Sequence, residues 1–337
     1  MSFATLADFE AALSAPIAPD ADAIAQARAR QADLTKPPGS LGRLEEIAIF
    51  FAGWQGRARP RIERGRVAVF AGNHGVVAHG VSAFQAAVTA QMVANFEHGG
   101  AAINALAGAA GLELKVVALD LDRPTADFTV APAMTEAECL AALSAGAATV
   151  EAGLDLLVLG EMGIGNTTAA AALCARSLGG DGAAWVGPGT GIDDAGIARK
   201  VAVVDRAVAC HADAPMTAFE TLRRVGGREI AAIAGAVLRA RQVRVPVLLD
   251  GFICCSAVAP LAVAAPAVIA HCLAGHCSAE PGHRRLLTAL GLDPILHLDM
   301  RLGEASGAAV AANIVRAALA AHDGMATFAE AGVSGAG

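Results

Sequence analysis

The chain has 337 residues, of which 55% are hydrophobic but only 4% aromatic, a balance typical of Ala-rich helices around a Val/Leu-rich sheet. Its 25 basic and 32 acidic residues give a formal net charge of −7 at pH 7, which argues against nucleic-acid binding because that function needs a basic face. Seven cysteines in a chain this long form no paired framework, so we expect reduced, buried thiols and a cytoplasmic protein.

The N-terminal region is predicted to be helical. Leu6, Phe9 and Leu13 lie at mixed helical spacings, and an amphipathic helix is expected over 41–51, after a stiff proline turn at 36–40. The first residues carry acids and lack a basic start followed by an apolar run, so no secretory signal is predicted.

Buried apolar runs alternate with helical segments through most of the chain. The runs stand near residues 67, 114, 156, 184 and 246, with a sixth candidate near 268. This rhythm predicts an α/β fold with a mostly parallel, Rossmann-like sheet flanked by helices. The helices at the two ends have no partner strands. We therefore predict a large α/β nucleotide-binding and catalytic domain over 60–300, and a small helical domain made of 1–59 plus 301–337.

Several helix ends carry recognisable signals. Thr135 is a plausible N-cap with Glu138 at the capping-box position, and Ser306 is expected to cap the long C-terminal helix. Asp193 and Asp194 are candidate Mg²⁺ ligands, but acids in the first turn of a helix are the more ordinary interpretation.

One uncharged stretch, 251–270, has about the length of a membrane span. Pro260 and Pro266 interrupt it, and small residues dilute its apolarity. We predict a buried strand end, a turn and a helix there, and no membrane span.

The stretch from Leu156 to Thr168 reads as a doubly buried strand that ends at Gly160, a glycine-rich turn and an Ala-rich helix. Such a turn presents backbone N–H groups and a positive helix end, which suits a phosphate. The pattern matches neither GxGxxG nor the GxxxxGK[ST] loop, so a simple tight connection remains an alternative. Glu161 would repel a phosphate and is better suited to a neutral or cationic part of the same ligand.

Other candidate residues have structural alternatives of equal or greater weight. His74 follows the first predicted strand, where a hydrogen-bonded structural histidine is the more common case. Lys200 is either a phosphate ligand or a surface lysine. The histidines and cysteines between 271 and 283 match none of the common zinc spacings, and no metal site is predicted.

Eight blocks taken together resemble one family, the nicotinate-nucleotide:dimethylbenzimidazole phosphoribosyltransferases of cobalamin lower-ligand assembly. They run in order over residues 35 to about 310. The blocks are TKPPGSLGRLE (35–45), AGNHGVVAHGVSAF (71–84), VTAQM (88–92), GEMGIGNTT (160–168), VGPGTGIDDAGIARK (186–200), LDGFI (249–253), GHCSAEPGH (275–283) and LDMRLGEASGAA (298–309).

The resemblance implies a cofactor-free and metal-free glycosyltransferase that acts on two small molecules, works as a homodimer and has its helical domain built from both termini. It would convert nicotinate mononucleotide and 5,6-dimethylbenzimidazole into α-ribazole 5′-phosphate and nicotinate, with Glu304 as general base. The implied phosphate and ribose residues are Glu161, Gly163, Ile164, Gly165, Asn166, Thr167, Gly189, Thr190, Gly191 and Lys200. The implied base-binding residues are Ser82, Phe84, Gln91, Leu302 and Gly303.

The sequence departs from the family pattern at Asn73, where related sequences often have an acid before the histidine, so an acid partner for His74 is not evident. Two other functions remain as alternatives. A nicotinamide-dinucleotide oxidoreductase requires GxGxxG after the first strand, where this chain has AGNHG. A non-catalytic sensor of the ribazole nucleotide would keep the pocket without needing Glu304.

Overall fold

The computed structural model of the chain describes residues 2–189 and 191–334. Its centre is a five-stranded sheet in the order β2-β1-β3-β4-β5, and every neighbouring pair is parallel. The central strands are β1 (Gly65–Ala71) and β3 (Leu156–Met162); the others are β2 (Glu113–Ala118), β4 (Val247–Leu249) and β5 (Cys272–Ala274). All of β1 is buried, as expected for an apolar run covered on both faces. The predicted α/β class is confirmed.

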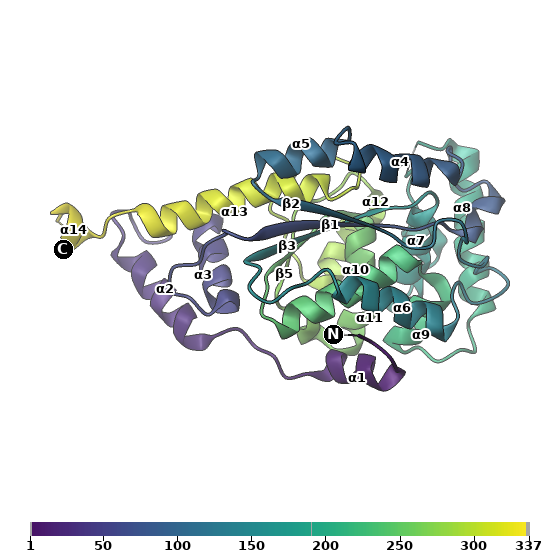
Figure 1. Ribbon diagram of the computed structural model, residues 1–337, viewed down its shortest axis with the longest axis horizontal. Helices are drawn as coiled ribbons and strands as arrows, with labels where there is room; N and C mark the ends of the chain where they lie inside the picture. The colour runs from purple at the N-terminus through teal and green to yellow at the C-terminus, as the bar shows by residue number, and fades with distance from the viewer. Residues whose placement is uncertain (1, 190, 335–337) are drawn as a thin grey trace.

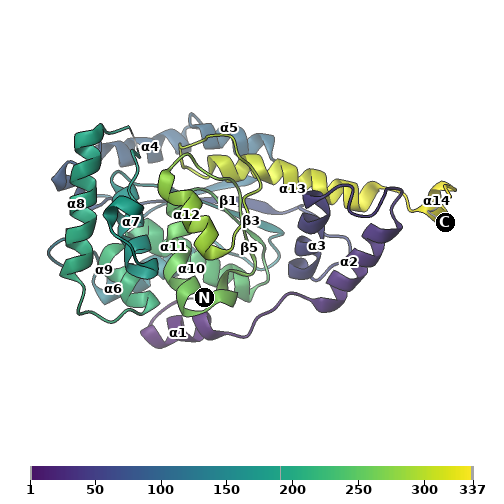
Figure 2. The same cartoon turned by 180° about the vertical axis from the view of Figure 1, so that it is seen from behind.

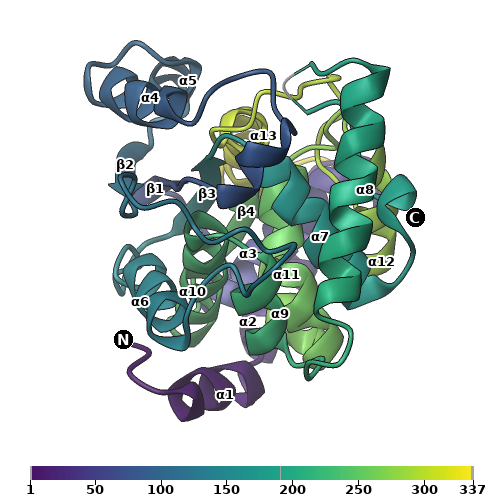
Figure 3. The same ribbon diagram turned by 90° about the vertical axis from the view of Figure 1, so that its right-hand side faces the viewer.

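Helices cover both faces of the sheet (Figures 1 and 3). Alternate side chains such as Phe70 and Leu159 point into one hydrophobic core, shared with α6 (Glu136–Ala147), α7 (Asn166–Leu178), α10 (Arg228–Gln242) and α11 (Phe252–Ala264). The intervening side chains, such as Val69 and Val158, pack with α3 (Arg43–Gln55), α5 (Ala102–Ala109) and α13 (Ser306–Gly324). This alternation follows from the two-residue period of a strand.

The remaining described elements connect or flank these layers. The α-helices are α1 (Leu6–Ser14), α2 (Ala21–Asp33), α4 (Ala87–Glu97), α8 (Asp194–Cys210), α9 (Ala218–Val225), α12 (Pro281–Leu290) and α14 (Phe328–Ala331). The 3₁₀ turns are η1 (Gly75–His79), η2 (Gly182–Ala184) and η3 (Pro266–Ile269).

The two ends of the chain meet different parts of the molecule. Figure 2 shows α2 and α3 beside the far half of the long helix α13, where Arg30 Nε donates to the His322 carbonyl oxygen at 2.7 Å. Helix α1 packs elsewhere, because the Phe9 ring meets the Phe219 ring of α9 edge-on at 5.6 Å. The division into domains at 59/60 and 300/301 stays a prediction.

Two predicted strands are wrong. The run at 183–186 is not a strand: its first two residues belong to η2, which is capped by Asp181 Oδ1 accepting from Ala184 N at 3.1 Å. The sixth candidate near 268 forms η3, and the last strand is β5, four residues further on. Only the second half of each run is buried, Trp185 and Val186 in one and Val268 and Ile269 in the other, and a short apolar run does not by itself distinguish a strand from a turn.

Two predicted element ends are also wrong. Strand β3 continues through Gly160 to Met162, and Gly160 instead provides room for the backbone of Ala305, which any Cβ at Gly160 would overlap. Ser306 is the first residue of α13, and the N-cap is Ala305.

Other local predictions are confirmed. Thr135 and Glu138 form a capping box at the start of α6, and the Asp193 side chain caps α8 through Gly196 N at 2.8 Å. Residues 252–264 form the predicted helix, α11, although Pro260 lies inside this helix and does not interrupt it. Within the described part of the chain, no helix has both the length and the apolarity that crossing a membrane requires.

Candidate active site

A cavity of about 420 Å³ opens at the carboxyl edge of the sheet, where the loops after β1, β3, β4 and β5 meet the turn before α13. In open parallel sheets ligands bind at this edge, beside the point where strand order reverses, here between β1 and β3. Ten predicted residues line the cavity: Phe84, Glu161, Gly163, Ile164, Asn166, Thr167, Gly189, Leu302, Gly303 and Glu304.

The glycine turn after β3 forms one wall. A Cβ at Gly163 would lie 2.7 Å from the Gly72 carbonyl oxygen, so the turn packs directly on the loop after β1. Gly165 has φ 90° and is the N-cap of α7, a conformation that only glycine adopts readily. Asn166 and Thr167, the first residues of this 13-residue helix, line the cavity, so the positive end of the helix dipole lies beside it.

Cationic groups lie at the same end of the cavity. Lys200 is buried, and its Nζ donates to Thr167 Oγ1 at 2.7 Å and to the Gly187 carbonyl oxygen at 3.2 Å. Burial lowers the pKa of Lys200 to about 8. Lys200 thus lies behind the cavity wall and contacts it through Thr167. Arg301, which lines the cavity, donates from Nη1 to the Gly189 carbonyl oxygen at 3.4 Å.

The second glycine loop is only partly described. Gly189 lines the cavity, whereas Gly191 closes a local turn by donating from its N–H to the Pro188 carbonyl oxygen at 3.0 Å. Thr190, another predicted phosphate ligand, lies outside the described residues.

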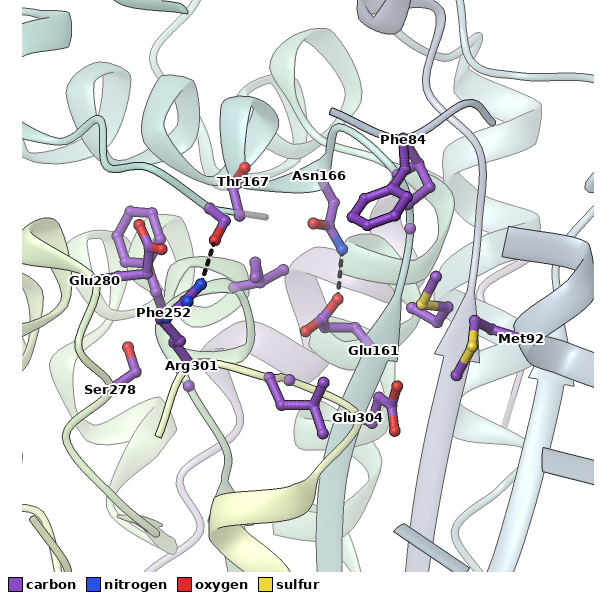
Figure 4. Close-up of a pocket in the computed structure, with 18 of the residues that line it drawn as sticks. Phe84, Met92, Glu161, Asn166, Thr167, Phe252, Ser278, Glu280, Arg301 and Glu304 are labelled. Atoms are coloured by element: carbon purple, nitrogen blue, oxygen red, sulfur yellow. Dashed lines mark hydrogen bonds between the residues drawn. The ribbon is translucent and has the colours of Figure 1, made fainter. Parts of the chain in front are cut away.

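Two glutamates occupy the middle of the cavity, between the polar end with Thr167, Ser278 and Arg301 and the apolar end with Phe84 and Met92 (Figure 4). Glu161 accepts a hydrogen bond from Asn166 Nδ2. Burial, reinforced by the nearby carboxylate of Asp250, raises the pKa of Glu161 to about 8. Burial also raises the pKa of Glu304 above its ordinary value. Both carboxyl groups therefore gain and lose a proton at a pH closer to neutrality than an exposed glutamate does.

The apolar end is more open. Phe84 is 51% exposed and Leu302 57% exposed, and Met92 and Met162 extend the same wall. Flat aromatic ligands fit such a slot. Neither Ser82 nor Gln91 is among the residues that line this cavity: Ser82 Oγ accepts from Phe84 N at 3.2 Å, and Gln91 is exposed on α4. Their assignment to base binding stays a prediction.

His74 does have an acid partner, supplied by a distant helix. Its Nε2 lies 2.6 Å from Glu229 Oε1 on α10, and both side chains are fully buried. Asn73 instead donates from Nδ2 to the Leu121 carbonyl oxygen at 2.9 Å. The pair does not line the cavity but lies beneath its wall, because a Cβ at Gly163 would be 3.2 Å from Glu229 Oε1.

Sequence reasoning missed the lining residues that follow β4 and β5. These are Gly251, Phe252, Ile253, His276, Ser278 and Glu280, together with Arg301 before α13 and Val88, Met92 and Met162 on the apolar side. Because ligands bind at the carboxyl ends of parallel strands, the residues after β4 and β5 were predictable in principle. That prediction required the correct position of β5.

The histidines between 271 and 283 are used in packing and hydrogen bonding. His271 Nε2 lies 3.0 Å from the Val237 carbonyl oxygen, and His283 Nδ1 accepts from Ser278 N at 2.9 Å. Across residues 2–189 and 191–334, no group of three or more His, Cys, Asp or Glu residues is arranged to hold a metal ion.

Comparison with known proteins defines the class. The model of a family described as phosphoribosyltransferase matches residues 17–333. With nearly the whole length matched, the chain belongs to this phosphoribosyltransferase family.

The relatives carry a more specific name. A protein of Novosphingobium aromaticivorans, 74% identical and matched over 98% of both chains, is named nicotinate-nucleotide–dimethylbenzimidazole phosphoribosyltransferase. So is one of Ruegeria pomeroyi, 60% identical over 98% of this chain and 97% of its own. The crystal structure of CobT from Thermus thermophilus is similar with a TM-score of 0.88 and 46% identity, over 94% of this chain and 100% of that one.

Proposed function

We propose that this protein transfers the phosphoribosyl group of nicotinate mononucleotide to 5,6-dimethylbenzimidazole, which yields α-ribazole 5′-phosphate and nicotinate for cobalamin assembly. One observation carries the proposal: a phosphate-type glycine turn and a buried glutamate, Glu304, line the same cavity with an apolar slot beside them. The names of the full-length relatives agree with it.

The proposed reaction needs one proton acceptor. A benzimidazole ring nitrogen attacks C1′ of the ribose with its lone pair, while the C1′–N bond breaks and its electrons leave with nicotinate. The pyridinium needs no acid because its departure neutralises the ring. The other ring N–H of the acceptor loses its proton to Glu304, and attack opposite the leaving group turns a β-nucleotide into an α-product.

The positions of the other groups support this arrangement. The N-terminal turn of α7, with Lys200 behind Thr167, favours the 5′-phosphate at the polar end. Phe84, Met92 and Leu302 favour the flat acceptor at the apolar end. Glu161, hydrogen-bonded to Asn166, lies between them and is suited to the ribose hydroxyls.

Replacing Glu304 tests the base assignment. Glu304→Gln keeps the size of the side chain but accepts no proton, so turnover should fall by about 10²–10⁴-fold while nucleotide binding is retained. Nicotinate release measures turnover, and calorimetric titration with nicotinate mononucleotide measures nucleotide binding.

The outcomes separate the alternatives. Near-normal turnover in Glu304→Gln would move the base to Glu161. Tight nucleotide binding by the unaltered protein, without any nicotinate release when both substrates are present, would instead favour a sensor.

The resemblance further leads us to propose a homodimer in the cytoplasm. The half-exposed apolar side chains of Phe84 and Leu302 at the cavity mouth favour a covering partner, and the cysteines, including exposed Cys210, are free thiols. Light scattering at micromolar concentration tests the dimer, and a monomeric mass would contradict it.

A further inference from the structure

The turn that carries Glu304 has an unusual backbone. Gly303, Glu304 and Ala305 are three successive left-handed residues, with φ 86°, 62° and 69°. A non-glycine residue rarely adopts this conformation, which persists only where the surroundings hold it. The sequence therefore places Glu304 in a conformation that its own backbone does not favour.

Asp250 is one of the groups that hold this turn, together with strand β3, where the Glu161 carbonyl oxygen accepts from Glu304 N at 3.3 Å. Asp250 lies at the carboxyl end of β4, is fully buried, and its Oδ1 accepts from Ala308 N at 2.9 Å. The backbone of Gly307 and Ala305 at the same turn further favours the charged form of this carboxyl group, whose Oδ2 is buried without a hydrogen-bond partner among the described residues. One side chain from a different strand thus caps the first turn of α13, the role that the sequence predicted for Ser306.

The surroundings leave the capped turn little room to move. A Cβ at Gly160 would overlap Ala305, and one at Gly307 would overlap the ring of His276. His276 Nε2 in turn lies 3.5 Å from Asp250 Oδ1. Strand β3, the loop after β5 and Asp250 therefore enclose the turn on separate sides.

Asp250 itself does not line the cavity, whereas Glu304 does. The buried carboxylate is costly, since burial raises the pKa of Asp250 to about 7 against the helix N–H groups that lower it. Asp250 therefore reaches the cavity through the turn that carries Glu304, and its charge also acts on Glu161.

We propose that Asp250 is a positioning residue, which fixes the left-handed turn 303–305 so that the Glu304 carboxylate is aimed at the acceptor base. This inference rests on the proposed function, because it assigns Asp250 its effect through the proposed general base.

The test is Asp250→Asn, which keeps the shape but removes the negative charge that the N-terminal turn of α13 stabilises. We expect kcat to fall by about 10²-fold, the scale of a 1 Å misplacement of a catalytic group. The KM for nicotinate mononucleotide should stay within about threefold, since the phosphate end of the cavity is untouched. A fall in kcat/KM caused by KM alone would overturn the proposal.

Asp155→Asn is the matched control. Asp155 is also buried and accepts from two backbone N–H groups, those of Glu63 and Arg64, each at 2.9 Å, but it precedes β3 at the opposite edge of the sheet. This variant should lose stability and keep kcat.

A double-mutant cycle shows whether Asp250 acts through Glu304. In a Glu304→Gln background, Asp250→Asn should change the residual kcat by less than about threefold. A further loss of about 10²-fold in that background would overturn the proposal while leaving Glu304 as the base. Wild-type turnover in Glu304→Gln alone would instead overturn the base assignment, and this inference with it.

If Asp250→Asn does not fold, Asp250→Asn with Ala305→Gly replaces it, because glycine adopts the left-handed conformation without strain. The folded double variant should still show reduced kcat with an unchanged KM. Wild-type kcat in that variant would contradict the proposal.

Discussion

Burial sets the protonation of the groups in the cavity. Glu161 and Glu304 have raised pKa values because the charged form of a carboxyl group loses its hydration, and Lys200 has a lowered one for the same reason. Acids and an amine thus titrate closer together than they would in water. Such convergence is typical of catalytic sites.

The pH dependence of the reaction follows from these shifts. As the proposed general base, Glu304 accepts a proton only when ionised, so kcat/KM should rise with pH through a pKa above the ordinary 4.5 of glutamate. In the proposed function the positive charge of Lys200 behind Thr167 favours the phosphate, so kcat/KM should fall as the pH passes about 8. Initial rates across pH 4–10, corrected for the acceptor's own protonation, measure both limbs. An acid limb at or below 4.5 would contradict the role of Glu304.

Removing the Lys200 amine should weaken nucleotide binding. Lys200→Ala deletes one charged hydrogen-bond donor, worth about 1.5–3 kcal/mol, so the KM for nicotinate mononucleotide should rise by about 10–150-fold. Thr167 would also lose its 2.7 Å donor. Lys115→Ala on strand β2, outside the cavity, is the matched control and should leave KM unchanged. An unchanged KM in Lys200→Ala would make this lysine structural.

At the scale of elements, α6 and α10 approach so closely that side chains do not separate them. A Cβ at Gly146 would overlap the Ala232 carbonyl oxygen, and one at Gly235 would overlap that of Leu143. The two glycines therefore allow backbone to meet backbone. This contact supports the helix whose start carries Glu229, the partner of His74.

Gly235→Ala should consequently destabilise the protein although alanine is the better helix former. The helix gain is about 1 kcal/mol, but overlap with backbone that cannot rotate away should lower the free energy of unfolding by a net of about 1–3 kcal/mol. Gly108→Ala in α5, where a Cβ meets nothing within 4 Å, should raise it by about 0.5–1 kcal/mol. Urea unfolding measures the free energy of unfolding of both variants. Equal changes in Gly235→Ala and Gly108→Ala would contradict the packing argument.

At the scale of the whole molecule, helices from both ends of the chain share a hydrophobic core with the sheet. Phe51 of α3 and Ala312 of α13 belong to the same buried cluster as Val69 of β1 and Val158 of β3. The predicted domains 1–59 plus 301–337 and 60–300 would therefore be joined through apolar contacts and not only through the chain.

A shared core predicts one cooperative unfolding transition. In scanning calorimetry, the calorimetric and van't Hoff enthalpies of the unliganded protein should agree. Two resolved transitions would indicate that the small helical unit unfolds independently.

The sequence by itself determined the α/β class, because short apolar runs that alternate with Ala-rich helices are typical of a parallel sheet covered by helices. It also determined the glycine turn after β3 and the family, since eight ordered blocks carry far more information than any one of them. Local signals such as the Thr135 capping box were readable for the same reason: all their partners lie within four residues.

Only the tertiary structure decided which distant groups meet. The acid beside His74 is Glu229, 155 residues away. The side chain that accepts a hydrogen bond from the first turn of α13 is that of Asp250 rather than that of the adjacent Ser306. The short apolar runs near 184 and 268 form 3₁₀ turns rather than strands. Periodicity records which side of an element is buried, whereas packing selects the partner that satisfies each buried polar group, and that choice depends on the whole chain.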